Sequence, residues 1–279
     1  MIGVNLVTTK KELRERLRDA NGTVGLVMTM GALHDGHLRL VEAARRDSDT
    51  VVVSIYVNPL QFAPDEDFDT YPRDLDKDLA LLGDADIVFA PSDDEMYPRK
   101  PLVRIDPGAV ATDFEGRTRP THFAGVLQAV AKVLSVVRPD RAYFGQKDAQ
   151  QLALITTMAA DLDLGVDIVP VPIVRDEDGL ALSSRNAYLS ETDRVAALAL
   201  VSALTEAKDA AAGGASPAEA EQILNEALAS AGGVSVDYAT IVSPKTFHRV
   251  SSTAQNGLAI VAARVGSTRL IDNMEVSFG

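Results

Sequence analysis

Short apolar runs alternate with stretches of helical spacing between residues 25 and 174. The apolar runs predict buried strands at residues 25–29, 51–57, 87–90 and 142–144, and a last, extended run covers 166–174. Apolar residues three or four apart predict helices at 38–46, 75–82, 123–137 and about 148–160. Pro170 and Pro172 place the last extended run at an edge or a bend. The alternation predicts an α/β fold, a Rossmann-like doubly wound parallel sheet whose ligands bind beyond the carboxyl ends of its strands.

The pattern changes after about residue 190. Two helices, 192–212 and 217–229, are joined by a glycine-containing turn, and Ser216 with Glu219 predicts a capping box for the second. Three β-like runs follow, at 234–242, 258–265 and 268–271. We therefore expect a Rossmann-like first domain, residues 1–176, and a smaller α+β C-terminal domain, residues 177–279. Near the N-terminus, Thr9 and Glu12 predict a capping box that opens a further short helix.

Charge and composition narrow the class of protein. A net charge of −13 argues against nucleic acid as a partner, although a few concentrated cations could still bind ATP. The chain has no cysteine, so disulfides, thiolate nucleophiles and cysteine-ligated metals are excluded. No apolar run approaches the roughly 18 residues that would predict a membrane span. No secretory signal is visible, and we expect a cytoplasmic protein without a membrane partner.

A histidine-containing segment follows the first long predicted strand. Residues 28–37 read Met-Thr-Met-Gly-Ala-Leu-His-Asp-Gly-His and lead into a helix, whose N-terminus offers unpaired N–H groups to an anion. His34 and His37 add two donors, and Gly31 and Gly36 let a flat ring or a phosphate approach the backbone. A chance turn and a metal pair are the alternatives. Only two other histidines and no cysteine are available as ligands, so phosphate binding is favoured over metal binding.

His34 to His37 is similar to the HxGH signature of the nucleotidyltransferases related to class I aminoacyl-tRNA synthetases. Five further blocks of the chain resemble motifs of the pantothenate synthetase family. They are residues 53–62 (VSIYVNPLQF), 71–73 (YPR), 119–123 (RPTHF), 144–148 (FGQKD) and 178–186 (DGLALSSRN). One position departs from the family pattern, since Gln146 stands where glutamate is usual.

The resemblance implies an ATP-dependent ligase that forms a carbon–nitrogen bond in pantothenate biosynthesis. (R)-Pantoate and ATP would give a pantoyl adenylate and pyrophosphate, and β-alanine would then displace AMP to give pantothenate. The resemblance also implies magnesium with ATP, a second domain that closes over the active site, and a homodimer formed through the first domain.

The resemblance assigns roles to residues as well. The catalytic set is His34, His37, Lys147 and Arg185. The residues expected to line the ATP site are Met30, Gly31, Ala32, Leu33, His34, Asp35, Gly36, His37, Gly145, Gln146, Lys147, Asp148, Val174, Leu182, Ser183, Ser184 and Arg185. Gln61 is expected to bind both pantoate and β-alanine, and Gln151 to bind pantoate. Lysine and arginine are also natural phosphate ligands on chemical grounds.

Asp76 and Asp78 are candidates for magnesium ligands, although acidic residues in the first turn of a helix explain both equally well. Three other functions stay open. They are an HxGH adenylyltransferase with a different acceptor, an ATP-binding sensor without turnover, and an HxxH metallohydrolase.

Overall fold

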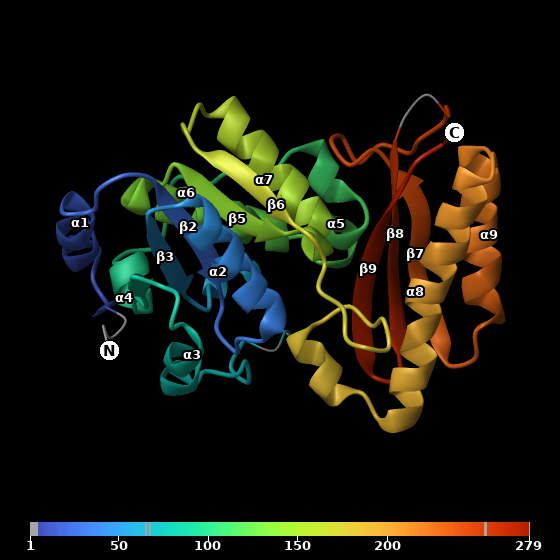
Figure 1. The fold of residues 1–279 in the computed structure, drawn as a ribbon, viewed down its shortest axis with the longest axis horizontal. Coiled ribbons are helices and arrows are strands. Elements are labelled where there is room, and N and C mark those ends of the chain that lie inside the picture. Colours follow the sequence, from blue (N-terminus) through green and yellow to red (C-terminus); the bar gives the residue numbers. More distant parts are fainter. Residues whose placement is uncertain (1–4, 65, 67, 254–255, 279) are drawn as a thin grey trace. The chain divides into compact units, whose positions relative to one another are not determined.

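The larger of two sheets has six strands, all parallel, in the order β1-β4-β3-β2-β5-β6. The computed structural model describes residues 5–64, 66, 68–253 and 256–278 (Figure 1). The strands of this sheet are β1 (Asn5–Val7), β2 (Val24–Thr29), β3 (Thr50–Ile55), β4 (Ile87–Phe89), β5 (Arg141–Gly145) and β6 (Asp167–Val171). The predicted doubly wound parallel sheet is confirmed, and β6, with its Pro170, is an edge strand as expected.

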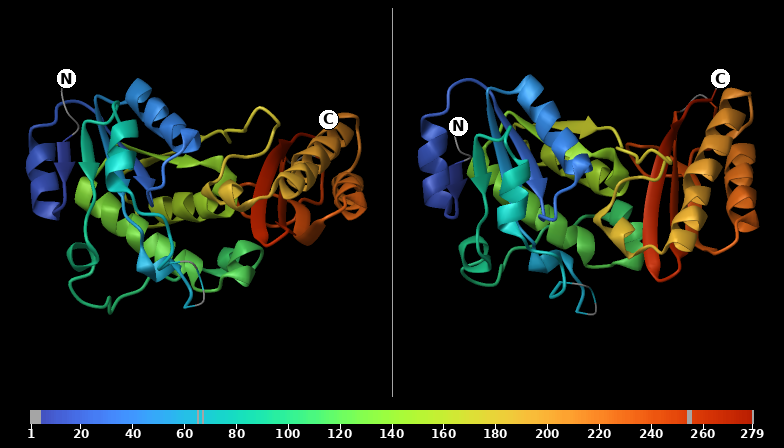
Figure 2. Two further views of the ribbon diagram at one scale, coloured as in Figure 1. Left: turned by 90° about the horizontal axis from the view of Figure 1, so that it is seen from below. Right: turned by 60° about the horizontal axis from the view of Figure 1, so that its bottom comes forward.

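Helices cover both faces of this sheet. The helices that precede β6 in the chain are α1 (Lys10–Arg18), α2 (Asp35–Asp47), α3 (Leu75–Leu81), α4 (Asp93–Met96), α5 (Glu115–Thr118), α6 (His122–Val137) and α7 (Ala149–Asp161). Figure 2 shows α2 and α6 on opposite faces. Val51 and Val53 of β3 pack with the apolar side of α2, while Val52 between them is also fully buried. Burial of successive residues is what a strand covered on both faces requires.

Contacts within the chain divide it into two compact units. The first unit is Met1–Gln146 with Leu154–Pro172, and the second unit is Lys147–Ala153 with Ile173–Gly279.

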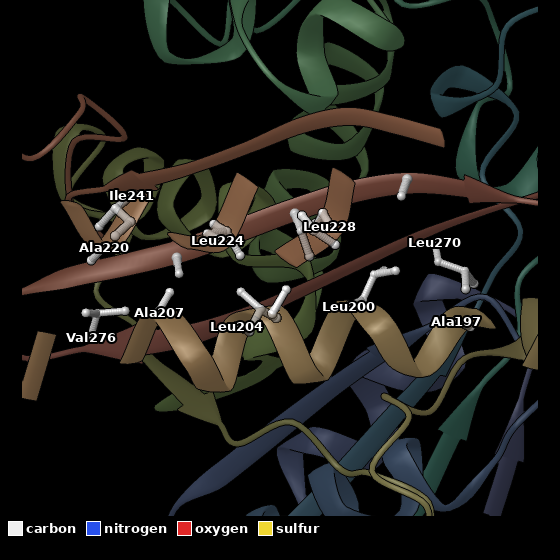
Figure 3. Close-up of a cluster of buried hydrophobic side chains, with 14 of the residues drawn as sticks. Ala197, Leu200, Leu204, Ala207, Ala220, Leu224, Leu228, Ile241, Leu270 and Val276 are labelled. Carbon is white, nitrogen blue, oxygen red and sulfur yellow. The ribbon is translucent and has the colours of Figure 1, made fainter. Parts of the chain in front are cut away.

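The second unit has a three-stranded antiparallel sheet, β7-β8-β9. Its elements are α8 (Glu191–Ala212), α9 (Pro217–Ser230), β7 (Val234–Val242), β8 (Gly257–Val265) and β9 (Thr268–Val276). Leu200 and Leu204 of α8 and Leu224 and Leu228 of α9 pack with apolar side chains of the sheet in one buried cluster (Figure 3). The capping boxes predicted at Thr9 and Ser216 are both present.

Two strands differ from the sequence prediction. β1 was not predicted, because a three-residue strand with only Val7 buried leaves no apolar pattern. β9 continues to Val276, whereas the apolar run was expected to end at residue 271. Asp272 and Asn273 interrupt the run, yet both are buried within the strand.

Candidate active site

The order in which strands are added to the larger sheet changes direction between β2 and β5. Chain segments after β2 build the sheet outward through β3, while β5 pairs with the other side of β2. The carboxyl ends of strands at such a switch point are where ligands bind in α/β sheets. The segments at these two ends are Met30 to His37 after β2 and, at the end of β5, Gly145 with the following Gln146.

Met30 to His37 forms a tight turn whose backbone is held in place. Gly31 has a φ of +82°, and a Cβ there would come within 2.8 Å of Oδ2 of Asp78. Ala32 is also left-handed, with a φ of 51°. The backbone N–H groups of Ala32 and Leu33 donate to the two carboxylate oxygens of Asp78, at 3.1 and 2.8 Å. Glycine is required at 31, because any other residue would be strained and would collide with this carboxylate.

The side chains of His34 and His37 form a reciprocal capping box at the first turn of α2. Nδ1 of His34 accepts a hydrogen bond from the backbone N–H of Gly36 at 3.1 Å, and Nδ1 of His37 accepts from the backbone N–H of His34 at 3.3 Å. The ring centroids are 4.1 Å apart. Because each Nδ1 is an acceptor, each neutral ring carries its proton on Nε2. The pair therefore presents N–H donors at a helix N-terminus, where an anion is favoured.

The acidic candidates for metal binding have different surroundings. Asp78 is 2% exposed, and both of its oxygens accept the backbone hydrogen bonds just described. Asp76 is exposed on the same helix, α3. Within the described residues, no three histidine or acidic side chains are grouped so that they could hold a metal ion. The structure thus gives Asp78 a supporting role under the Met30–His37 turn.

Gln61 lies in a short 3-10 turn, Pro59–Gln61, and its side chain is fixed at both ends. Its Oε1 accepts from Nδ2 of Asn58 at 3.0 Å, and its Nε2 lies 2.9 Å from Sδ of Met30. A Cβ on Gly125 of α6 would come within 2.1 Å of the carbonyl oxygen of Leu60, so only glycine lets the helix approach this turn. Gln61 and Met30, both predicted site residues, are therefore in contact.

Arg119 and His122 anchor the backbone of Gln61, a role that sequence reasoning did not assign. Nη2 of Arg119 and Nδ1 of His122 lie 3.3 and 3.0 Å from the carbonyl oxygen of Gln61. Arg119 also binds Glu66 through two hydrogen bonds of 2.5 and 2.7 Å. Burial opposes the ionisation of Glu66, but the hydrogen bonds and charge of Arg119 outweigh it and lower the pKa of the carboxyl. The only signal for this network was the block at 119–123.

The second unit contains the remaining predicted residues. Lys147 and Asp148 belong to the 3-10 turn Gln146–Asp148, and Gln151 is half-buried in the first turns of α7. Val174 pairs with Leu182, whose backbone N–H donates to the Val174 carbonyl oxygen at 2.9 Å.

Ser183 caps the turn Ser184–Tyr188 by accepting from the backbone N–H of Arg185 at 3.2 Å, and the side chain of Arg185 is exposed. An exposed guanidinium behind two half-buried serines can bind a phosphate. Arg194 of α8 binds Asp176 and Asp178 just before this turn, at 2.7 and 2.8 Å. The hydrogen bond from Arg194 lowers the pKa of the Asp178 carboxyl.

A doubly wound parallel sheet with a histidine-capped helix N-terminus at its switch point defines an α/β protein of the nucleotide-binding class. The family model described as pantoate-beta-alanine ligase matches residues 5–275. The chain belongs to this ligase family.

Individual relatives agree with the family match. The pantothenate synthetase of Acidothermus cellulolyticus is 52% identical over 269 residues, covering 94% of this chain and 88% of that protein. A crystal structure of the Thermus thermophilus enzyme has a TM-score of 0.93 at 47% identity, covering 98% of this chain and all of that one. A pantoate-beta-alanine ligase from Francisella tularensis, solved with beta-gamma ATP and beta-alanine, has a TM-score of 0.80 at 32% identity, with 98% and 97% coverage.

Within the described residues, no helix is long and apolar enough to cross a membrane.

Proposed function

We propose that the chain ligates (R)-pantoate and β-alanine at the expense of ATP, giving pantothenate, AMP and pyrophosphate. The observation that carries the proposal is the histidine pair, whose rings both use Nδ1 to cap α2 and so present protonated Nε2 atoms at a helix N-terminus. The family match over residues 5–275 and the Francisella ligase solved with an ATP compound and β-alanine support the choice of substrates.

The reaction takes place in two steps. A pantoate carboxylate oxygen attacks the α-phosphorus of ATP, and the bond from that phosphorus to the pyrophosphate oxygen breaks. The amine nitrogen of β-alanine then attacks the carbonyl carbon of the pantoyl adenylate. AMP leaves, and the nitrogen loses a proton. Neither step requires a nucleophile from the protein. The protein accelerates both steps by positioning the substrates and neutralising charge.

Charge on the triphosphate is neutralised by His34, His37, Lys147 and Arg185 in this proposal. The Nε2–H donors of the histidines and the positive end of the α2 dipole stabilise the oxygens around the α-phosphorus. Gln61 can bind pantoate and β-alanine, since its amide has a second oxygen lone pair and a second N–H beyond those engaged by Asn58 and Met30. Gln151 binds pantoate.

The rest of the predicted ATP site follows the same assignment. Backbone and side-chain groups of Met30, Gly31, Ala32, Leu33, Asp35, Gly36, Gly145, Gln146, Asp148, Val174, Leu182, Ser183 and Ser184 line the nucleotide.

Magnesium enters as the counterion of ATP. Each oxygen of the Asp78 carboxylate accepts a backbone hydrogen bond, so the proposal assigns Asp78 to the support of the Met30–His37 turn and leaves the magnesium ligands open. Mg²⁺ bound with a nucleotide commonly keeps several waters and takes phosphate oxygens. No step of the reaction is assigned to a protein-bound metal.

A homodimer formed through the first domain is part of the proposal. Leu102 and Val103 of the first unit are 85% and 81% exposed, and such adjacent apolar side chains suit a protein contact. A cytoplasmic location stays a prediction.

Product analysis tests the proposed function. Purified protein with ATP, magnesium, (R)-pantoate and β-alanine is expected to form AMP, pyrophosphate and pantothenate in equal amounts. Omission of pantoate should abolish AMP formation. Release of ADP and phosphate, or turnover with another acid but none with pantoate, would refute the assignment.

A further inference from the structure

Two consecutive residues of β9 contact both segments of the second unit that carry the proposed triphosphate cations. Asn273 binds the backbone of Lys147, and Asp272 binds Arg175 at the base of a hairpin, residues 174–182, that leads to Arg185. We propose that Asp272 and Asn273 are positioning residues for the adenylation step, fixing the backbone from which Lys147 and Arg185 reach ATP. This inference rests on the proposed function in taking those two cations as ATP ligands.

The contact with Lys147 is a single directed hydrogen bond. Nδ2 of Asn273 donates to the carbonyl oxygen of Lys147 at 2.9 Å, and Asn273 is 5% exposed. Lys147 lies in a three-residue 3-10 turn, which has little hydrogen bonding of its own. A lysine ammonium sits on a flexible four-carbon stem, so its position depends on where the backbone is held. Loss of the Asn273 donor would release that backbone.

The contact with the hairpin is a bidentate ion pair. Nη1 and Nη2 of Arg175 lie 2.6 and 2.9 Å from the two carboxylate oxygens of Asp272, whose side chain is only 3% exposed. Nη1 of Arg175 also donates to the carbonyl oxygen of Gly179 at 3.1 Å, across the hairpin. The fork of the guanidinium thus links β9 to both sides of the hairpin in a fixed geometry.

The hairpin connects the Arg175–Asp272 ion pair to the turn that contains Arg185. Arg175 pairs with Ala181 in an antiparallel bridge, and the next residue, Leu182, donates to Val174 at 2.9 Å. Ser183 follows directly and caps the turn Ser184–Tyr188, which packs against β9. Ala181, the bridge partner of Arg175, is only four residues before Arg185, so displacement of the hairpin would displace the guanidinium as well.

The residue types argue against a purely packing role. β9 alternates buried and less buried residues from Thr268 to Asp272, and Asn273 breaks this alternation because it is buried directly after Asp272. Burying a carboxylate and an amide is costly unless each is paired, and apolar residues would fill the same space at lower cost. Both side chains are instead matched to partners on segments assigned to ATP.

The experiment uses isosteric variants of the full chain. Asn273→Asp removes the donor, Asp272→Asn removes the charge, and Asp237→Asn is the matched control. Asp237 of β7 forms an ion pair of 2.6 Å with Arg269 of β9. This ion pair includes no residue of the Lys147 turn or of the hairpin that leads to Arg185. Each variant is assayed for pyrophosphate–ATP exchange with pantoate, for ATP affinity by calorimetric titration, and for conversion of preformed pantoyl adenylate with β-alanine.

A displacement of about 1 Å at a reacting group can cost roughly 100-fold in rate. We therefore expect both β9 variants to raise the Michaelis constant for ATP about tenfold and to slow exchange by about 10- to 100-fold. Their conversion of preformed adenylate should stay within about threefold of the parent, because the second step needs no triphosphate ligand. The control should stay within about twofold in every assay.

Equal losses in both half-reactions, or unchanged ATP parameters in folded variants, would overturn the proposal. So would a loss of similar size in Asp237→Asn. If Asp272→Asn fails to fold, Asn273→Ala and Arg175→Lys test the same prediction. A parent protein that shows no exchange with pantoate would contradict the proposed function, while the ATP titrations would still decide the role of Asp272 and Asn273.

Discussion

The backbone N–H of Leu33 donates a hydrogen bond of 2.8 Å to Oδ1 of Asp78, 45 residues further along the chain. Oδ2 of the same carboxylate accepts from Ala32 at 3.1 Å. This buried acid therefore satisfies two donors in the turn that leads to the histidine pair. It also explains why the first helical turn of α3 contains one buried and one exposed aspartate.

Replacement of Asp78 should destabilise the fold. Asp78→Ala leaves two backbone N–H groups without their acceptor, one of them buried, and we expect a loss of about 2–3 kcal/mol in the free energy of unfolding. ATP affinity should fall as well. Asp76→Ala is the control and should change stability by less than about 0.5 kcal/mol. Urea unfolding measures the stability of both variants. A shared rise in the magnesium requirement, without loss of stability, would instead show that the two aspartates are metal ligands.

His34 caps α2, and the proposed function gives its Nε2–H a second role at the α-phosphorus; two substitutions separate these roles. Asparagine is a good N-cap residue, so His34→Asn should keep stability within about 0.5 kcal/mol, whereas His34→Ala should cost about 1 kcal/mol. Both should slow adenylation by about 10²–10³, since both remove the Nε2–H donor. Thermal unfolding and pyrophosphate exchange give the two readouts. Near-parental exchange in His34→Asn would show that the histidine serves only as a cap.

The sequence predicted β2, β3, β4 and β5 because each is a short, mainly apolar run. It also placed His34 and His37 at a helix N-terminus, where the structure has them. It could not predict that Asp78 supports the turn, because an acidic first helical turn has the same appearance whether or not a distant N–H pair needs an acceptor.

The anchoring of Gln61 by Arg119 and His122 was hidden for a similar reason. These partners are about 60 residues apart, and no local pattern links them. The predicted end of the last strand, at residue 271, was too early. Asp272 and Asn273 are polar and resemble the residues that follow a strand, although β9 continues to Val276.

Glu66 should make stability depend on pH in a defined direction. Its folded-state pKa is lowered, so its ion pair with Arg119 stabilises the fold above the unfolded-state pKa of about 4.3 and loses this effect as pH falls through the folded-state value. Glu66→Gln should therefore cost about 1.5–3 kcal/mol from pH 6 to 8, and the difference from the parent should shrink below about pH 4.3.

Urea unfolding of both proteins at a series of pH values measures this difference. Asp69→Asn, an exposed neighbour, is the control and should differ from the parent by less than about 0.5 kcal/mol throughout. A constant difference between parent and Glu66→Gln down to pH 3 would contradict the assignment.

Gln146 is the position where this chain departs from the family pattern. Glutamine is nearly isosteric with glutamate, and an ion pair near the surface contributes only about 0–1 kcal/mol. Gln146→Glu should therefore leave the maximal rate and the Michaelis constant for ATP within a few-fold of the parent. Steady-state kinetics of the parent and of Gln146→Glu measure both constants. A large change in either constant would mean that charge at position 146 tunes Lys147 directly.

Pyrophosphate–ATP exchange without β-alanine tests the central claim most directly, because it isolates formation of the acyl adenylate. With magnesium and (R)-pantoate, labelled pyrophosphate should be incorporated into ATP, and Lys147→Ala and His37→Ala should reduce the rate by about 10²–10³. Preformed pantoyl adenylate should restore much of the product formed by these variants. Exchange that requires another carboxylate and does not occur with pantoate would contradict the account.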